Sequence, residues 1–139
     1  MYTKIKIFSG TAGKVLTQKV CQCLSVKPGD ANLGRHADGE IKIQLEDVRN
    51  NDVFIINPTH PPAENFFEVM FLAEAARSAS AGRVTLVLPY LGYNRQDRKD
   101  RPRVPISARV IARVLSQSGA DRVLLLDLHS EPTAGFFDQ

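Results

Sequence analysis

The sequence predicts an α/β domain with a mostly parallel sheet that helices cover on both faces. Three short runs are almost wholly apolar, as strands buried on both faces are: Val53–Ile56, Val84–Leu88 and Val123–Leu126. Segments with helical spacing of apolar residues separate these runs, and strands that alternate with helices favour a parallel sheet. The chain has 139 residues, of which 43% are hydrophobic, so we expect a single domain, residues 1–139, with a core of its own.

The first part of the chain predicts two strands and a helix. Residues 3–8 (TKIKIF) alternate polar and apolar side chains, which is typical of a half-buried strand. Small residues at Ser9–Gly13 form a turn, and apolar positions from Val15 to Leu24 then recur at helical spacing. The segment Lys27–Asp30 (KPGD) breaks this helix. Residues 40–46 (EIKIQLE) alternate cleanly and predict a strand with one face in water.

The three buried strands follow, with helices between them. Phe66–Ala76 is apolar and rich in alanine, which indicates a buried helix, and a stripe of apolar residues from Ile106 to Leu115 predicts a further helix. In parallel sheets of this kind, ligands bind at the carboxyl ends of the strands. The loops expected to carry function are therefore Ser9–Gly13, Asn57–Glu64, Pro89–Arg103 and His129–Gln139.

The positive charge of the chain is concentrated in one of these loops. The chain has 18 basic and 15 acidic residues and a formal net charge of +3. Residues 95–103 hold five basic and two acidic side chains, also a net +3, so the remainder is neutral. A local excess of this kind favours one anionic ligand, and arginine binds phosphate oxygens in a fork. A solvated charged loop is the alternative.

Composition excludes several other classes of protein. The chain has no Trp and three Tyr, whereas single-strand nucleic-acid binders use aromatic platforms along a basic groove. No apolar run approaches the ~20 residues of a membrane span, and Met1–Gly10 lacks the apolar core of a signal peptide. Cys21 and Cys23 are two apart on a predicted helix, so they point to different faces and form neither a disulfide nor a metal site. We expect a cytoplasmic protein that binds neither nucleic acid nor membrane.

Two further groups of polar residues are candidate site residues. Asp127 and His129 follow the third apolar run, and strand alternation would point both to the same side, where they could serve a metal, a proton or a phosphate. A histidine that bonds only to neighbouring backbone is the alternative. Asp38 and Glu40 flank Gly39 before a strand and could accept hydrogen bonds from a base or ribose, although Asp-Gly is also an ordinary turn dipeptide.

Taken together, these features resemble a known family, ribose-phosphate diphosphokinase (phosphoribosyl diphosphate synthetase). The segments that carry the resemblance are RHADGEIKI, RVTLVLPYLGYNRQDRKDRPRVPISARVIARVL and GADRVLLLDLHSEPTAGFFD, in this order and spacing. The similarity covers essentially the whole chain, from KIKIFSGTAG to GFFD. It implies a phosphoribosyltransferase-like α/β fold with a small antiparallel flap. It also implies transfer of a diphosphoryl group from Mg-ATP to the 1-hydroxyl of ribose 5-phosphate, giving phosphoribosyl diphosphate and AMP.

The resemblance also assigns roles to residues by position. In the family, the positions of His36, Asp38 and Glu40 contact the adenine and ribose of ATP. The loop positions that hold ATP correspond to Arg95, Gln96, Lys99 and Asp100, and the position of His129 meets the cluster of metal and phosphates. His129 is thus the implied catalytic and Mg²⁺-binding residue. The family usually has Phe where His36 stands, and Asp47 replaces a residue that helps to bind an anion in phosphate-activated members.

Family members are about twice as long as this chain and contain two similar domains. The second domain supplies the loop that holds ribose 5-phosphate and a flexible segment with catalytic Lys and Arg, and neither resembles any part of residues 1–139. The sequence therefore predicts the amino-terminal ATP-side half, inactive without the second domain, with Phe136 and Phe137 exposed. The family assembles its ATP site across subunits, which predicts a homo-oligomer. The alternative is a non-catalytic half-length protein that associates with full-length synthetase and regulates it.

Overall fold

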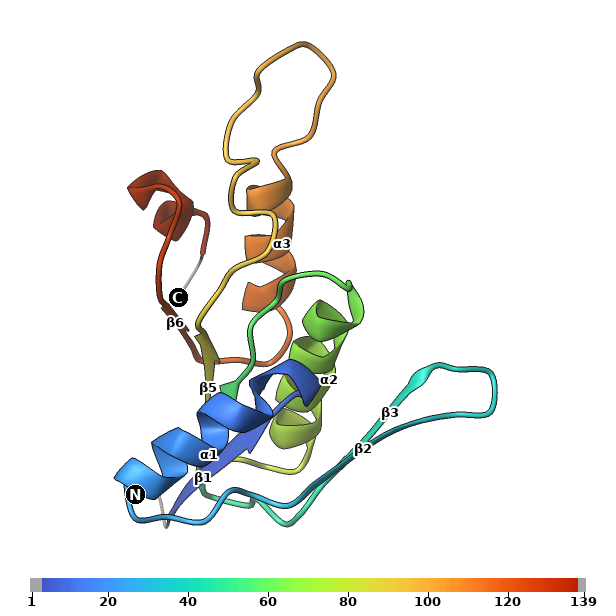
Figure 1. The fold of residues 1–139 in the computed structure, drawn as a ribbon, viewed down its shortest axis with the longest axis vertical. Helices are drawn as coiled ribbons and strands as arrows, with labels where there is room; N and C mark the ends of the chain where they lie inside the picture. Colours follow the sequence, from blue (N-terminus) through green and yellow to red (C-terminus); the bar gives the residue numbers. More distant parts are fainter. Residues whose placement is uncertain (1–3, 138–139) are drawn as a thin grey trace.

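The computed structural model describes residues 4–137. Figure 1 shows the order of the elements along the chain. In sequence they are β1 (Ile5–Ser9), the 3-10 helix η1 (Thr11–Gly13), α1 (Lys14–Cys23), β2 (Ala31–Arg35), β3 (Ile41–Leu45), β4 (Asp52–Ile56), α2 (Glu64–Ser78), β5 (Arg83–Leu88), α3 (Ser107–Ser116), β6 (Arg122–Leu125) and the 3-10 helix η2 (Glu131–Phe136).

A four-stranded parallel sheet forms the centre of the molecule. Its strand order is β1-β4-β5-β6, and every neighbouring pair is parallel. The register places Ile56 of β4 opposite both Ser9 of β1 and Val87 of β5. All four carboxyl ends consequently lie at one edge of the sheet, and this confirms the mostly parallel α/β fold that the sequence predicts.

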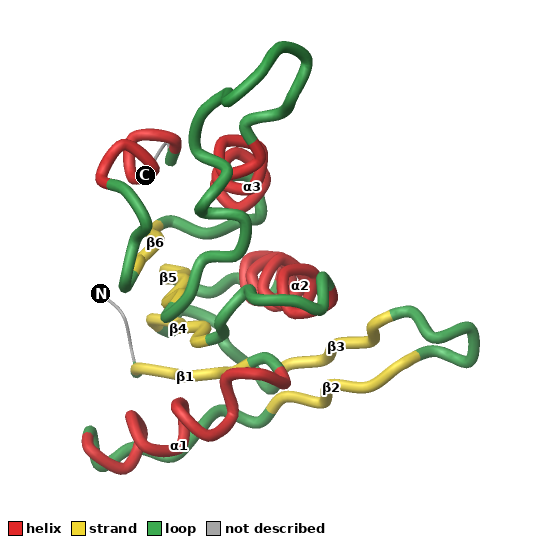
Figure 2. The backbone as a smooth tube through the Cα atoms, turned by 45° about the horizontal axis from the view of Figure 1, so that its top comes forward, coloured by secondary structure: helices red, strands yellow, loops and turns green. Residues whose placement is uncertain are grey.

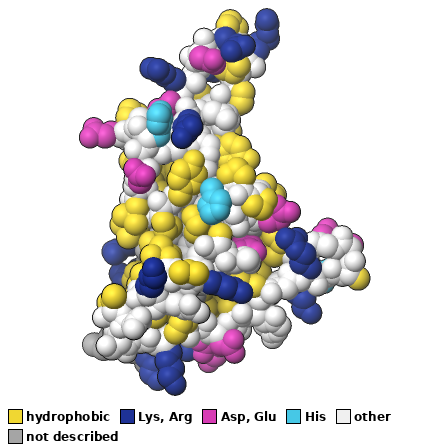
Figure 3. Space-filling view, in the orientation of Figure 1, with side chains coloured by type: hydrophobic (Ala, Val, Ile, Leu, Met, Phe, Trp, Pro, Cys, Tyr) yellow, Lys and Arg dark blue, Asp and Glu magenta, His cyan; other side chains and the backbone are white. Residues whose placement is uncertain are grey.

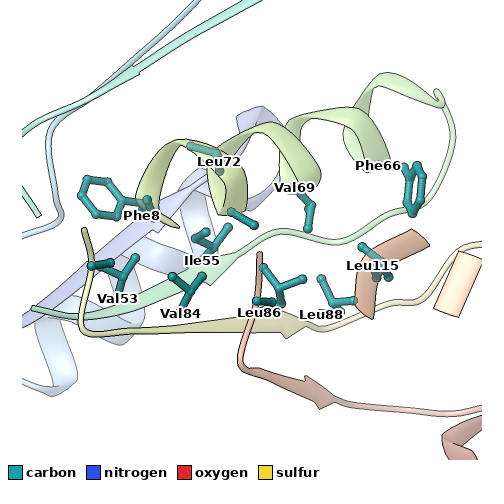
Figure 4. Packing of buried hydrophobic residues seen from close by; sticks show 14 of the residues in the cluster. Phe8, Val53, Ile55, Phe66, Val69, Leu72, Val84, Leu86, Leu88 and Leu115 are labelled. Atoms are coloured by element: carbon teal, nitrogen blue, oxygen red, sulfur yellow. The ribbon is translucent and has the colours of Figure 1, made fainter. Parts of the chain in front are cut away.

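Helices cover the two faces of the sheet unequally. Figure 2 shows α1 on one side of the strands and α2 and α3 on the other. The larger core cluster lies beneath α2, where Val69 and Leu72 pack against Ile55 and Leu86 of the central strands (Figure 4). A smaller cluster under α1 contains Ile7, Cys21 and Ile56. Strands β4 and β5 thus have apolar cover on both faces, as their continuous apolar sequences require.

The antiparallel flap consists of β2 and β3, which pair from Ala31–Leu45 at one end to Arg35–Ile41 at the other. In β3, Ile41, Ile43 and Leu45 are half-buried and the intervening side chains are exposed, so the predicted strand with one wet face is confirmed. Sequence analysis did not predict β2, because its sequence, ANLGR, has neither a β-branched residue nor a clean alternation.

The prediction that residues 123–126 form a strand buried on both faces is wrong. Strand β6 ends at Leu125 and forms the edge of the sheet, with a neighbour on one side only. Leu124 and Leu126 are 52% and 48% exposed, because α1 covers the other end of the sheet. Asp127 has a φ of +54°, so the extended backbone ends before His129. Strand alternation therefore does not place the side chains of Asp127 and His129 on the same side.

Two smaller predictions have different outcomes. Phe136 and Phe137 are half-buried rather than exposed, and Phe137 packs against the main core cluster. Cys21 is buried and Cys23 is exposed, so the two thiols do point in different directions and both are free. Strand β1 begins at Ile5, whereas Thr3 of the predicted strand and Asp138 and Gln139 of the last predicted loop lie outside the described residues.

No helix within residues 4–137 combines the length and the apolar character needed to cross a membrane. The longest helix, α2, has 15 residues.

Replacing Leu86 with Ala should lower the free energy of unfolding by about 2–5 kcal/mol, the usual loss for a fully buried leucine. Leu86 is 0% exposed on β5. The matched control is Leu124→Ala on the edge strand, which should cost less than about 1 kcal/mol because that side chain is half exposed already. Urea unfolding measures both losses of free energy, provided that the slope of the unfolding free energy against urea concentration stays the same in the variants. Equal losses would restore the prediction that β6 is buried on both faces.

Candidate functional site

Three loops meet at the carboxyl edge of the parallel sheet because the backbone packs very tightly there. A Cβ atom on Gly13 would lie 2.2 Å from the carbonyl oxygen of Ile56, and one on Gly92 would lie 2.2 Å from that of Thr59. Only glycine permits approaches of this kind. The turn after β1 is thereby pressed against β4, and the loop after β5 against the connection between β4 and α2.

Buried polar side chains fix the same loops. Thr59 donates its backbone N–H to the carbonyl of Tyr90 at 2.9 Å, and its hydroxyl accepts the N–H of Gly92 at 2.9 Å. Asn57, which is completely buried, donates its side-chain amide to the carbonyl of Asn65 at 3.1 Å. These bonds join the ends of β4 and β5 to the start of α2. Sequence analysis did not predict these hydrogen bonds. The sequence shows only that polar residues follow the apolar strands, and this pattern does not identify their partners.

The loop between β5 and α3, which we call the basic loop (Pro89–Ile106), extends away from this edge (Figure 1). It lines an open pocket of about 420 Å³ formed by Arg95, Gln96, Arg98, Asp100, Arg101, Val104 and Pro105. Lys and Arg side chains gather at its tip (Figure 3). In that tip Asp100 accepts a long hydrogen bond of 3.4 Å from Arg101, and both residues are largely exposed. The arrangement leaves arginine donors available to an anion.

Gln96 anchors the basic loop at its base. Its backbone N–H bonds to the carbonyl of Tyr93 at 3.1 Å, and its own carbonyl accepts the N–H of Ala108 at 3.1 Å. Its side-chain oxygen accepts the hydroxyl of Ser107 at 2.5 Å. Gln96 therefore holds the base of the loop against the first turn of α3, directly beside Arg95.

His129 lies in the turn between β6 and η2, on the same side of the sheet as the basic loop. The next residue, Ser130, donates its hydroxyl to Asp97 Oδ2 at 2.5 Å. This hydrogen bond holds the pKa of the Asp97 carboxyl below its ordinary value, and the nearby His129 and Arg98 act in the same direction. The basic loop and the His129 turn are thus close neighbours.

The flap carries the other predicted site residues. At its tip His36 donates its backbone N–H to the carbonyl of Glu40 at 2.8 Å, and Glu40 N–H bonds to Asp38 Oδ1 at 3.1 Å, around Gly39 with a φ of +93°. The three side chains are exposed. With Phe67 and Phe71 of α2, they line an open pocket of about 790 Å³. Sequence analysis did not single out these two phenylalanines, which are 44% and 43% exposed on the helix beside the flap.

The structure does not bring all the predicted site residues together in one chain. Arg95, Gln96, Lys99 and Asp100 share the basic loop, next to the turn of His129. The flap residues lie elsewhere: in both Figures 1 and 2, α2 separates the flap from α3 and the basic loop. Between the flap tip and the basic loop, the described part of the chain shows no hydrogen bond or ion pair. One copy therefore presents two separate candidate half-sites, one basic and one with carboxylates and aromatic rings.

The chain is similar to proteins of one known family. Residues 5–119 match the family described as the N-terminal domain of ribose phosphate pyrophosphokinase. The chain is 48% identical over 137 residues to the ribose-phosphate pyrophosphokinase of Rhodopirellula baltica, covering 97% of this chain and 43% of the relative. For the enzyme of that name from Shewanella oneidensis the identity is 52% over 137 residues, covering 96% of this chain and 44% of the relative.

A solved structure has the same fold. The phosphoribosylpyrophosphate synthetase of Mycobacterium smegmatis superimposes with a TM-score of 0.92 at 36% sequence identity, covering 98% of this chain and 46% of that one. The chain thus spans less than half the length of the relatives it matches. It belongs to the ribose-phosphate pyrophosphokinase family and corresponds to the amino-terminal half of its members.

Proposed function

We propose that this chain is the ATP-binding half of a ribose-phosphate pyrophosphokinase. In this proposal the basic loop holds Mg-ATP through Arg95, Gln96, Lys99 and Asp100, with the cations contacting the triphosphate. The flap of a second copy, with His36, Asp38 and Glu40, binds the adenine and ribose. The observation that supports it most is the separation of the two half-sites in one chain: each presents part of the chemistry that a nucleotide needs, and an oligomer would unite them.

The chemical character of each half-site supports this assignment. Guanidinium groups bind phosphate oxygens in pairs, and the exposed arginines of the basic loop surround an open pocket. The flap pocket combines carboxylates, which accept hydrogen bonds from ribose hydroxyls, with the rings of Phe67 and Phe71, which offer an apolar surface to a base. His36 adds a third ring at the same place.

Magnesium fits this site as a companion of ATP. Among residues 4–137, no group of three or more His, Cys, Asp or Glu side chains is arranged to hold a metal ion. Mg²⁺ is commonly bound by one or two protein groups together with substrate phosphates, and His129 beside the basic loop is the residue proposed to meet it. When bound, the ion neutralises charge on the phosphates during transfer. The residues of the chain hold the phosphates in line and exclude other orientations.

The complete reaction needs a second substrate site. The 1-hydroxyl oxygen of ribose 5-phosphate would attack the β-phosphorus of ATP and lose its proton. The bond between the β-phosphorus and the oxygen that bridges it to the α-phosphate would break, and AMP would leave with that oxygen. In-line placement of two substrates contributes about 7–11 kcal/mol to reactions of this kind. We propose that a second domain supplies the ribose 5-phosphate site, and that the chain works in a reducing compartment, the cytoplasm, with both thiols free.

Replacing Arg95 with Ala should weaken Mg-ATP binding about 10- to 100-fold, because it removes a charge-assisted contact worth roughly 1.5–3 kcal/mol. Calorimetry on both proteins measures the change. Arg113→Ala is the matched control: it removes the same charge from an exposed position on α3 and should leave the affinity within about twofold. Equal affinities of the wild type and Arg95→Ala would contradict the role of the basic loop.

The purified chain alone should release no AMP in the presence of Mg-ATP and ribose 5-phosphate. Without a site for the second substrate, the rate should fall by several powers of ten, roughly tenfold for every 1.4 kcal/mol of lost positioning. A coupled assay for AMP tests this. Rapid AMP formation that depends on ribose 5-phosphate would show that these 139 residues contain both substrate sites.

Mixing two defective variants tests whether one site uses two copies. Asp38→Asn combined with Glu40→Gln impairs the flap and keeps the turn, whereas Arg95→Ala impairs the basic loop. If sites form between copies, random co-assembly should restore Mg-ATP binding at about one quarter of the sites. Calorimetric stoichiometry of the mixture, after denaturation and joint refolding, measures this fraction. Binding that stays at the level of the separate variants would place the site within one chain.

A further inference from the structure

We propose that Ser130 is a positioning residue that ties the His129 turn to the basic loop through its hydrogen bond to Asp97. This inference rests on the proposed function, in which the His129 turn and the basic loop hold the phosphates of ATP and the Mg²⁺ bound to them. It assigns Ser130 and Asp97 a task separate from nucleotide contact: they fix the distance between Arg95 and His129, which lie in loops from different strands.

The side chain of Ser130 is committed to this connection rather than to its own helix. Ser130 occupies the N-cap position of η2, where a serine normally accepts a backbone N–H, yet its side chain makes no capping bond there. Instead its hydroxyl donates to Asp97 Oδ2 at 2.5 Å. The hydroxyl oxygen of Ser130 also lies 3.1 Å from the hydroxyl of Thr133, a residue with no exposed surface. The donor is thereby held in a fixed direction.

Asp97, which accepts this hydrogen bond, directly follows Gln96, the residue that anchors the base of the basic loop. Gln96 is bonded to Tyr93, Ser107 and Ala108. Beyond Asp97, residues 98–103 are all exposed, and the ion pair found among them joins the neighbours Asp100 and Arg101. Asp97 is therefore the last residue before the exposed tip of the loop that is tied to the body of the protein, and Ser130 at the start of η2 makes that connection.

Losing this bond should loosen the site more than it destabilises the fold. Asp97 and Ser130 are half-buried at the surface and belong to neither core cluster, so their contribution to the global free energy of unfolding is small. Two loops would, however, gain freedom that nucleotide binding has to remove again, and such ordering reduces affinity.

The test compares Ser130→Ala and Ser130→Thr with the wild type by hydrogen exchange and calorimetry. Ser130→Ala should speed exchange at the backbone N–H groups of Gln96 and Thr133 about fivefold or more, weaken Mg-ATP binding about three- to tenfold and leave the melting temperature nearly unchanged. Ser130→Thr keeps a hydroxyl and should restore both values. Ser78→Ala is the matched control, because it removes a 2.6 Å hydroxyl–carboxylate bond to Glu74 on the exposed face of α2.

The outcomes separate the two proposals. Faster exchange with no Mg-ATP binding by the wild type would support the connection and contradict the proposed function. Unchanged exchange in Ser130→Ala, or an equal change in Ser78→Ala, would overturn the connection whatever the affinity. If Ser130→Ala does not fold, Asp97→Ala removes the acceptor from the other side. It should reproduce the faster exchange at Thr133, and unchanged exchange there would overturn the proposal.

Discussion

The parallel pairing of β4 and β5 is the constraint on which the rest of the structure depends. Both strands are buried on two faces, so their register is fixed by packing as well as by hydrogen bonds. Their carboxyl ends coincide, and Gly13 and Gly92 let neighbouring backbone approach to distances that no side chain would allow. The basic loop follows β5 and the His129 turn follows β6. Because β5 and β6 are neighbouring parallel strands, the two segments start close together.

The same architecture separates the two halves of the candidate site. The flap packs along one side of α2 and α3 lies on the other (Figure 2). Helix α2 therefore stands between the carboxylates of the flap and the cations of the basic loop. This separation is the reason why we propose that a second copy supplies the missing half of the site.

Sequence analysis predicted the features that depend on local pattern. The alternation of β3, the apolar runs of β4 and β5 and the charge of the basic loop all follow from side-chain periodicity or composition. Sequence analysis was wrong where burial depends on the position of a strand in the sheet. Strand β6 has an apolar sequence like that of β5, yet its place at the edge of the sheet leaves Leu124 half exposed. The hydrogen bond between Ser130 and Asp97 joins residues 33 positions apart, and no local pattern indicates such a partner.

The most direct test of the account is a crystal structure of this chain with Mg²⁺ and an ATP analogue whose α,β-bridging oxygen is replaced by a methylene group. The account predicts one nucleotide between two copies, with its phosphates on Arg95 and Gln96 of one and its adenine beside His36 and Asp38 of the other. A nucleotide whose base and phosphates both contact a single copy would contradict it.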